Sequence, residues 1–139
     1  MGSRISVRHS EPAPTEADLP PALSRLLERF MVYLRVECGL RPASVEAYRW
    51  DATLLLADLA GAGVKDLAGA TPRHLADHLA ALKTRRLMSG TSVIRHLATI
   101  RVLCRWALAQ GLVQQDPSTV LDRPHRWKKL PEVLSPAPM

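Results

Sequence analysis

Leucines and other aliphatic residues recur at intervals of three and four along most of this chain, and no stretch alternates apolar with polar residues for long. Intervals of three and four place side chains on one face of a helix, whereas a strand shows a period of two. Glycines and prolines separate the periodic stretches, as expected for turns between helices. The pattern therefore predicts an all-α fold with no sheet in its core.

Four helices are expected at about residues 21–38, 42–60, 72–85 and 92–110, with a fifth short helical turn at 117–121. Proline suits the first turn of a helix and glycine the position just past its end. Pro21, Pro42 and Pro72 fit three of the starts, and Gly39 and Gly111 fit two of the ends. Aromatic residues make up only 4% of the 139 residues, so the core should be largely aliphatic. We expect one compact bundle of four to five helices.

The fourth predicted helix is expected to place its polar residues opposite its aliphatic ones. Its inner face would carry Val93 or Ile94, Leu97, Ile100, Cys104, Ala107 and Leu108. Its outer face would carry Ser92, Arg95, His96, Thr99, Val102 and Trp106.

Other residues that often carry chemistry have ordinary explanations here. Cys38 and Cys104 lie in apolar helical contexts and are expected to be free, buried thiols in a reducing cytoplasm. His74 and His78 stand four residues apart, but no further metal ligand accompanies them and the glutamate of the HExxH motif is missing, so we expect exposed structural histidines. We expect no metal, no cofactor and no catalytic set of residues.

Neither a signal peptide nor a segment long enough to cross a bilayer is visible, so we expect a soluble cytoplasmic protein without membrane contacts.

The positive charge of the chain is concentrated between Asp77 and Asp116, where no acidic residue occurs. The cations of this segment are Lys83, Arg85, Arg86, Arg95, Arg101 and Arg105. Their number equals the formal net charge of +6, so the rest of the sequence balances to zero. A localised basic field attracts the phosphates of a polyanion. The alternative is a solvated basic face that serves solubility.

Two places combine cations with short polar side chains, as a surface that approaches DNA requires. One is the outer face of the fourth predicted helix, and the other is the start of the second, where backbone N–H groups attract phosphate. Candidate contacts are Arg41, Ser44, Arg49, Lys83, Arg85, Arg86, Ser92, Arg95, His96, Thr99 and Arg101. Trp50 should point outward, either as a surface aromatic or as a contact with a partner.

Several segments together resemble the N-terminal core-binding domain of Xer-type tyrosine recombinases and phage integrases. Gly39–Asp51 is similar to the segment that opens the second helix of that domain, and Ser92–Arg101 to its fourth helix. Asp116-Pro117 lies where such domains place Asn/Asp-Pro, and Lys128–Ser135 is similar to the linker into the catalytic domain. The resemblance covers about residues 22–135, in the family's order and spacing.

This resemblance implies an orthogonal, SAM-like helical bundle that clamps one side of a recombination site through its second and fourth helices. It implies the DNA-binding domain at 19–123 and a basic linker at 124–139, in which Lys128 and Lys129 would follow the DNA. Residues 1–18, with their prolines, small polar residues and lack of periodicity, are expected to be a flexible segment. The family's catalytic residues belong to a second domain, so this chain should not catalyse strand exchange itself. Double-stranded DNA is the expected partner, with other recombinase protomers joining on DNA and a monomer in isolation. The alternative is a helical module that docks on a recombinase or another protein.

Overall fold

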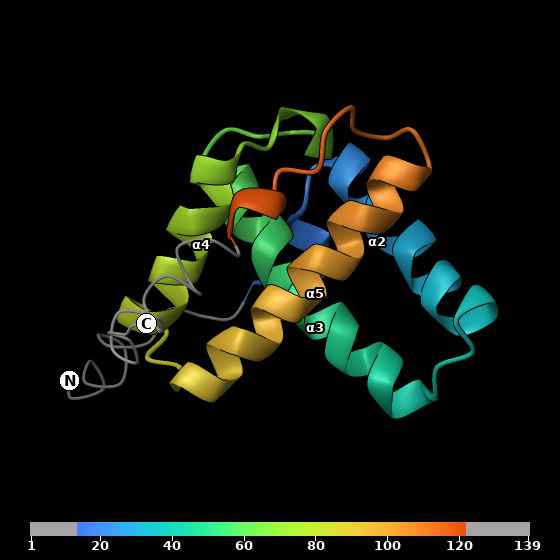
Figure 1. Cartoon of the computed structure of the whole chain (residues 1–139), viewed down its shortest axis with the longest axis horizontal. Coiled ribbons are helices and arrows are strands. Elements are labelled where there is room, and N and C mark those ends of the chain that lie inside the picture. The colour runs from blue at the N-terminus through green and yellow to red at the C-terminus, as the bar shows by residue number, and fades with distance from the viewer. Residues whose placement is uncertain (1–13, 122–139) are drawn as a thin grey trace, which may run out of the picture.

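The computed structural model of the protein describes residues 14–121, and within this range the secondary structure is helical throughout (Figure 1). Its four main helices confirm the predicted all-α fold. They are α2 (Pro21–Val32), α3 (Pro42–Gly61), α4 (Pro72–Thr84) and α5 (Gly90–Ala109). Shorter elements are the 3-10 turns η1 (Glu16–Asp18), η3 (Leu67–Gly69) and η4 (Thr119–Leu121), and the π-helical turn η2 (Tyr33–Glu37).

The helix starts follow from local chemistry. Proline occupies the first turn of α2, α3 and α4, where a missing N–H costs nothing. At α4 the Thr71 hydroxyl accepts the backbone N–H of His74 at 3.2 Å, and the His74 ring accepts the N–H of Thr71 at 3.0 Å. Ser89 caps α5 by accepting the N–H of Ser92 at 3.2 Å. These contacts satisfy donors that have no partner within the helix.

The first predicted helix, 21–38, ends with a wider turn than expected. Its last residues form the π-helical turn η2, and the N–H of Cys38 donates to the carbonyl of Tyr33 at 3.0 Å. Gly39 then takes a φ of +64°, which L-residues with a side chain rarely adopt, and lets the N–H of Leu40 close onto Leu34 at 3.1 Å. The chain can thereby reverse and begin α3.

Helix α3 lies at the centre of the bundle. It contacts α2 on one side and α4 on the other, and α5 crosses over it (Figure 1). The buried residues of the first three helices are largely those that the apolar periodicity indicated. In α2 and its continuation they are Leu23, Leu26, Leu27, Phe30, Met31 and Leu34, and in α3 they include Val45, Ala52, Leu55, Leu56 and Leu59.

Helix α5 is rotated relative to the expectation. Four residues predicted to face inward are buried as expected, namely Leu97, Ile100, Cys104 and Ala107. Of the alternatives Val93 and Ile94, Val93 is partly buried and Ile94 is exposed. Leu108, predicted to face inward, is exposed, whereas Leu103 is fully buried. His96 and Thr99, predicted to face outward, are buried as well. The physical reason is that α5 packs against both α3 and α4, which widens its buried face beyond one apolar stripe.

Trp106, also predicted to face outward, is buried in the main aromatic cluster of the described chain. Its ring lies 5.4 Å from that of Phe30 and 5.9 Å from that of Tyr33, and Tyr48 meets Phe30 edge-on at 6.4 Å. The guanidinium of Arg29 stands over the indole at 5.9 Å from its centroid. Phe30, Tyr33, Tyr48 and Trp106 therefore gather where α2, α3 and α5 meet, beside an otherwise aliphatic core.

Two further expectations were wrong. Cys38 is exposed, because the buried stripe of the first helix ends at Leu34, while Cys104 is buried as predicted. Burial of Cys104, with a smaller contribution from Asp116, raises the pKa of its thiol to about 12. His78 is buried rather than exposed, and its Nδ1 pairs with a carboxylate of α3 at 2.6 Å, whereas its Nε2 has no hydrogen-bond partner among the described residues.

Within residues 14–121, no helix combines the length and the apolar character needed to cross a membrane. In the same range, no three histidine, cysteine or acidic side chains converge as a metal site would require.

Candidate nucleic-acid interface

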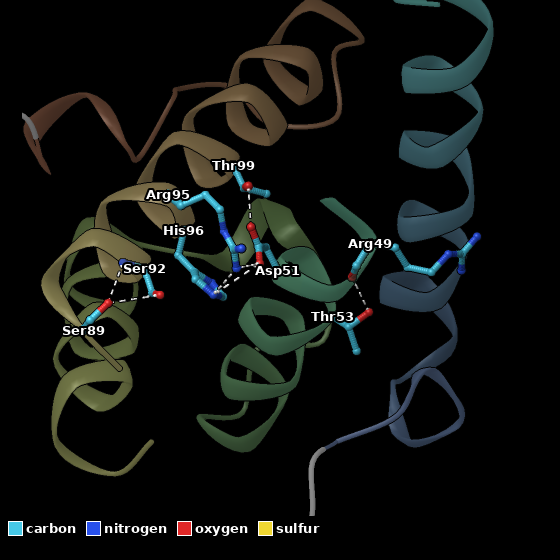
Figure 2. Close-up of polar contacts among 8 residues, drawn as sticks. All are labelled: Arg49, Asp51, Thr53, Ser89, Ser92, Arg95, His96 and Thr99. Carbon is cyan, nitrogen blue, oxygen red and sulfur yellow. Dashed lines mark hydrogen bonds and ion pairs between the residues drawn. The ribbon is translucent and has the colours of Figure 1, made fainter. Parts of the chain in front are cut away.

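Asp51 is a carboxylate in the middle of α3 that is only 3% exposed. Three residues of α5 contact it. Arg95 donates from Nη2 to Oδ1 at 2.8 Å, the His96 Nε2 lies 3.2 Å from Oδ1, and Thr99 donates from Oγ1 to Oδ2 at 2.9 Å (Figure 2). We call these four residues the Asp51 cluster. A buried charge is tolerated only when it is paired and hydrogen-bonded, and this cluster meets both conditions.

The histidine of this cluster favours its neutral form. Burial lowers the pKa of His96, and Arg95 lowers it further, although the Asp51 carboxylate opposes both effects. A neutral imidazole can still donate one N–H to Asp51, so the cluster holds one negative charge, on Asp51, and one positive charge, on Arg95. The charges of Arg95 and Asp51 therefore cancel, and the cluster as a whole carries no net charge.

A second carboxylate of α3, Asp58, collects a similar set two turns further along. His78 Nδ1 of α4 lies 2.6 Å from Oδ2, and Arg86 Nη2 donates to Oδ1 at 3.0 Å. Arg85 stands at 3.8 Å from the same Oδ1. Burial alone would raise the pKa of Asp58, but His78 and Arg86 outweigh it and hold that pKa below its ordinary value. We call Asp58, His78, Arg85 and Arg86 the Asp58 cluster.

Arg49 belongs to a different surface. Its Nη1 donates to Glu16 at 2.7 Å and to Glu28 at 3.1 Å, and its Nε lies 3.7 Å from Glu46. These hydrogen bonds raise its pKa. Figure 2 shows its side chain pointing away from Asp51. Three carboxylates thus surround Arg49, which leaves it a poor partner for phosphate.

The remaining candidates divide by exposure. His96 and Thr99 are buried in the Asp51 cluster, which does not suit the groove contacts expected of them. Arg86 and Arg101 are partly buried, as is Ser92, whose hydroxyl accepts that of Ser89 at 3.2 Å. Lys128 and Lys129 lie outside the described residues. The exposed candidates are Arg41, Ser44, Lys83, Arg85 and Arg95.

These exposed residues belong to three segments on one side of the bundle. They lie in or just before the first turns of α3, in the last turns of α4 and the turn after it, and in the first turns of α5. Figure 1 shows these three segments toward its lower side, with the loop between α3 and α4 at the upper side. We call this surface the basic side.

Asp51 and Asp58 were not singled out from the sequence, although they organise both clusters. A signal was present, because both stand among apolar residues in Trp50–Leu59 and are seven positions apart, on one face of a helix. A charged residue on an otherwise buried helix face is almost never left without a partner.

Comparison of the sequence with known protein families agrees with this arrangement of helices. The family model for the phage integrase N-terminal SAM-like domain matches residues 27–111, which is more than half of the chain. The chain belongs to this family. The resemblance noted from the sequence is thereby confirmed, as is the SAM-like fold class.

Curated relatives agree with this family. Tyrosine recombinase XerD of Bradyrhizobium diazoefficiens is 38% identical over 115 residues, which are 83% of this chain and 36% of the relative. XerD of Ralstonia nicotianae is 33% identical over 128 residues, 92% of this chain and 41% of the relative. XerC of Xanthomonas campestris is 29% identical over 127 residues, which are 91% of this chain and 39% of the relative. No solved structure matches the chain.

This member of the SAM-like family thus spans about two fifths of the length of these relatives. The match shows that the chain is related to tyrosine recombinases over this part of their length.

Proposed function

We propose that this chain is the DNA-binding, core-binding domain of a tyrosine site-specific recombinase. It grips one face of a recombination site in double-stranded DNA, and it does not itself exchange strands. The proposal assigns DNA binding to residues 19–123 and places Lys128 and Lys129, within 124–139, along the DNA toward a catalytic domain. Membership in the SAM-like integrase family and the names of the relatives support it.

The observation that carries the proposal is the exposure of cations from three segments on the basic side. Lys83 lies in the last turn of α4, and Arg85 follows that helix. Arg41 precedes the first turn of α3, whose free backbone N–H groups and the nearby Ser44 hydroxyl suit a phosphate. Neutralising DNA phosphates releases counterions, which supplies most of the affinity of non-specific binding.

Binding of this domain alone should be weak. Non-specific, phosphate-driven complexes have dissociation constants of about 10⁻⁴–10⁻⁶ M at physiological salt. In a complete recombinase, contacts from the other domain and from neighbouring protomers on the DNA would add to this grip. We expect the isolated chain to be a monomer.

A charge reversal on the basic side tests the proposal. Lys83→Glu should weaken binding to duplexes of any sequence and flatten the dependence of log K on log salt by about one unit or more. The matched control is Lys65→Glu. Lys65 is also an exposed lysine, but it lies in the loop between α3 and α4, at the opposite end of the bundle. Fluorescence anisotropy with a labelled duplex, at several salt concentrations, measures both effects.

Equal binding by both variants and the parent would contradict the proposal. It would then favour the second candidate, a helical module that docks on another protein. Trp50 supports that candidate, since it is exposed at 45% on α3 as predicted from the sequence. A protein-docking role should depend on Trp50 and not on Lys83.

A further inference from the structure

Two arginines beside the basic side are paired with carboxylates of α3, Arg95 with the buried Asp51 and Arg86 with the partly buried Asp58. They differ in how much of the arginine side chain remains exposed. The Arg86 side chain, on Asp58, is 17% exposed, whereas the Arg95 side chain, on Asp51, is 53% exposed. Arg86 is therefore largely taken up inside the protein. In Arg95, one guanidinium nitrogen is bound to Asp51, while about half of the side chain remains exposed to solvent.

The contacts of Arg95 explain this presentation. Only Nη2 reaches the interior, where it meets Asp51 at 2.8 Å and approaches the His96 ring at 3.4 Å. A guanidinium carries five N–H donors in a rigid, planar fork. With Nη2 fixed, the plane of the fork is fixed, and the donors on Nε and Nη1 remain available to an external partner. Thr99 and His96 fix the carboxylate in turn.

We propose that Asp51 is a positioning residue for DNA binding, which orients the Arg95 guanidinium and at the same time offsets its charge. This inference rests on the proposed function. Coulomb attraction between unlike charges in contact is strongest where water is excluded, as it is around the buried Asp51. Seen from a distant phosphate, the pair of Arg95 and Asp51 carries almost no net charge. Arg95 then adds a directed contact at short range but little general attraction to DNA.

This role differs from a purely structural one in its consequence for salt dependence. Each phosphate neutralised contributes about 0.9 to the slope of log K against log salt. An arginine with an offset charge should contribute much less than an uncompensated lysine. Removing the charge of Asp51 should therefore increase non-specific binding, whereas a residue needed only for folding should decrease it when replaced.

The first test is Asp51→Asn, which keeps the shape of the side chain but replaces one carboxylate oxygen by an NH2 donor. It can therefore no longer accept hydrogen bonds at both of the positions that Arg95 and Thr99 occupy. We expect tighter binding to a duplex of random sequence and a salt slope steeper by up to about one unit. Asp77→Asn is the control with the same change in net charge, because Asp77 is exposed on α4 and, within residues 14–121, its ion pair is with Arg73 at 3.5 Å. It should leave the slope nearly unchanged. Weaker binding by a folded Asp51→Asn variant, or an unchanged slope, would overturn the inference.

A second pair of variants keeps the test decisive if Asp51→Asn does not fold. Lys83→Gln should reduce the salt slope by about 0.9, and Arg95→Gln should reduce it by clearly less. An equal reduction in the two variants would show that the charge of Arg95 is not offset, and would refute the inference.

NMR separates this inference from the proposed function. In the free parent protein, the Nε–H resonance of Arg95 should show an ordered side chain, and in Asp51→Asn it should become mobile. An Arg95 side chain that is already mobile in the parent would contradict the orienting role. If the parent failed to bind DNA while Arg95 was ordered, the proposed function would fail and the orienting contact would stand.

Discussion

The hydrogen bond from Thr99 of α5 to Asp51 of α3 can be removed by a single substitution, and the resulting change in the free energy of unfolding measures its contribution to the packing of the two helices. Thr99→Val removes the hydroxyl and keeps the branched shape of the side chain. The hydroxyl donates to a buried carboxylate at 2.9 Å, and the threonine is 4% exposed. Hydrogen bonds to charged groups contribute about 1.5–3 kcal/mol, so we expect a loss of about 2 kcal/mol in the free energy of unfolding.

The chain supplies a matched control in Thr53 of α3, which is also 4% exposed (Figure 2). Its hydroxyl donates to the backbone carbonyl of Arg49 at 2.7 Å, one turn earlier in the same helix. This acceptor is neutral and already receives hydrogen bonds within the helix, so Thr53→Val should cost about 0.5–1 kcal/mol. Both substitutions exchange a buried threonine for valine, and only the charge of the acceptor differs.

Urea unfolding at pH 7.5, followed by far-ultraviolet circular dichroism, measures both variants. A loss of about 2 kcal/mol corresponds to a fall of roughly 6–12 °C in Tm for a domain of this size. The slope against urea should stay unchanged if the same surface is exposed on unfolding. Equal costs for the two variants would refute the reasoning, because they would mean that the Asp51 carboxylate gives the Thr99 hydroxyl no more than an ordinary carbonyl gives.

Two further predictions concern acid and packing. The pKa of His96 is lowered in the folded protein, so the unfolded chain binds more protons than the folded one below about pH 6.5. The urea concentration at the midpoint of unfolding should therefore decrease as the pH is lowered from 7.5 to 5. This decrease should be smaller in His96→Asn. The lowered pKa of Asp58 adds a further loss only below that group's usual value of 3.8, so its effect should be separable from that of the histidine. For packing, Leu103→Ala should cost about 2–5 kcal/mol because Leu103 is fully buried. Leu108→Ala should cost clearly less, about 1 kcal/mol or below, because Leu108 is 40% exposed. Equal costs for the two variants would contradict the observed orientation of α5.

The helix boundaries could be predicted from the sequence because each depends on residues close together in the chain. Thr71 and Pro72 open α4, Ser89 opens α5, and Gly39 ends the turn after α2. The chemistry of these caps and turns is local, so a reader of the sequence has all the partners in view. The family resemblance was visible for a similar reason, since it rests on short segments in a fixed order.

The rotation of α5 could not be predicted in this way. His96 and Thr99 are polar, and a count of apolar residues alone assigns them to the surface. Their burial depends on Asp51, which stands 48 positions before Thr99 in the sequence. The same limit applies to His78, whose burial depends on Asp58, 20 positions earlier. Pairing between distant polar residues is invisible to periodicity, and it decided which side of the helix faces inward.

Pairing between residues that are distant in the sequence also changes how the charge of the chain is distributed at the proposed interface. Between Asp77 and Asp116 the sequence shows cations without a single acid, yet the fold brings Asp51 and Asp58 from α3 against Arg95 and Arg86. Charges that are unopposed along the chain are therefore partly opposed in space. Under the proposed function, long-range attraction of DNA would come mainly from residues such as Lys83 and Arg41, which are exposed and form no ion pair within residues 14–121. Helix α3 thus contributes in two ways: its leucines form the centre of the core, and its carboxylates Asp51 and Asp58 pair with Arg95 and Arg86. Under the proposed function, this pairing would limit those two arginines to short-range contacts with DNA.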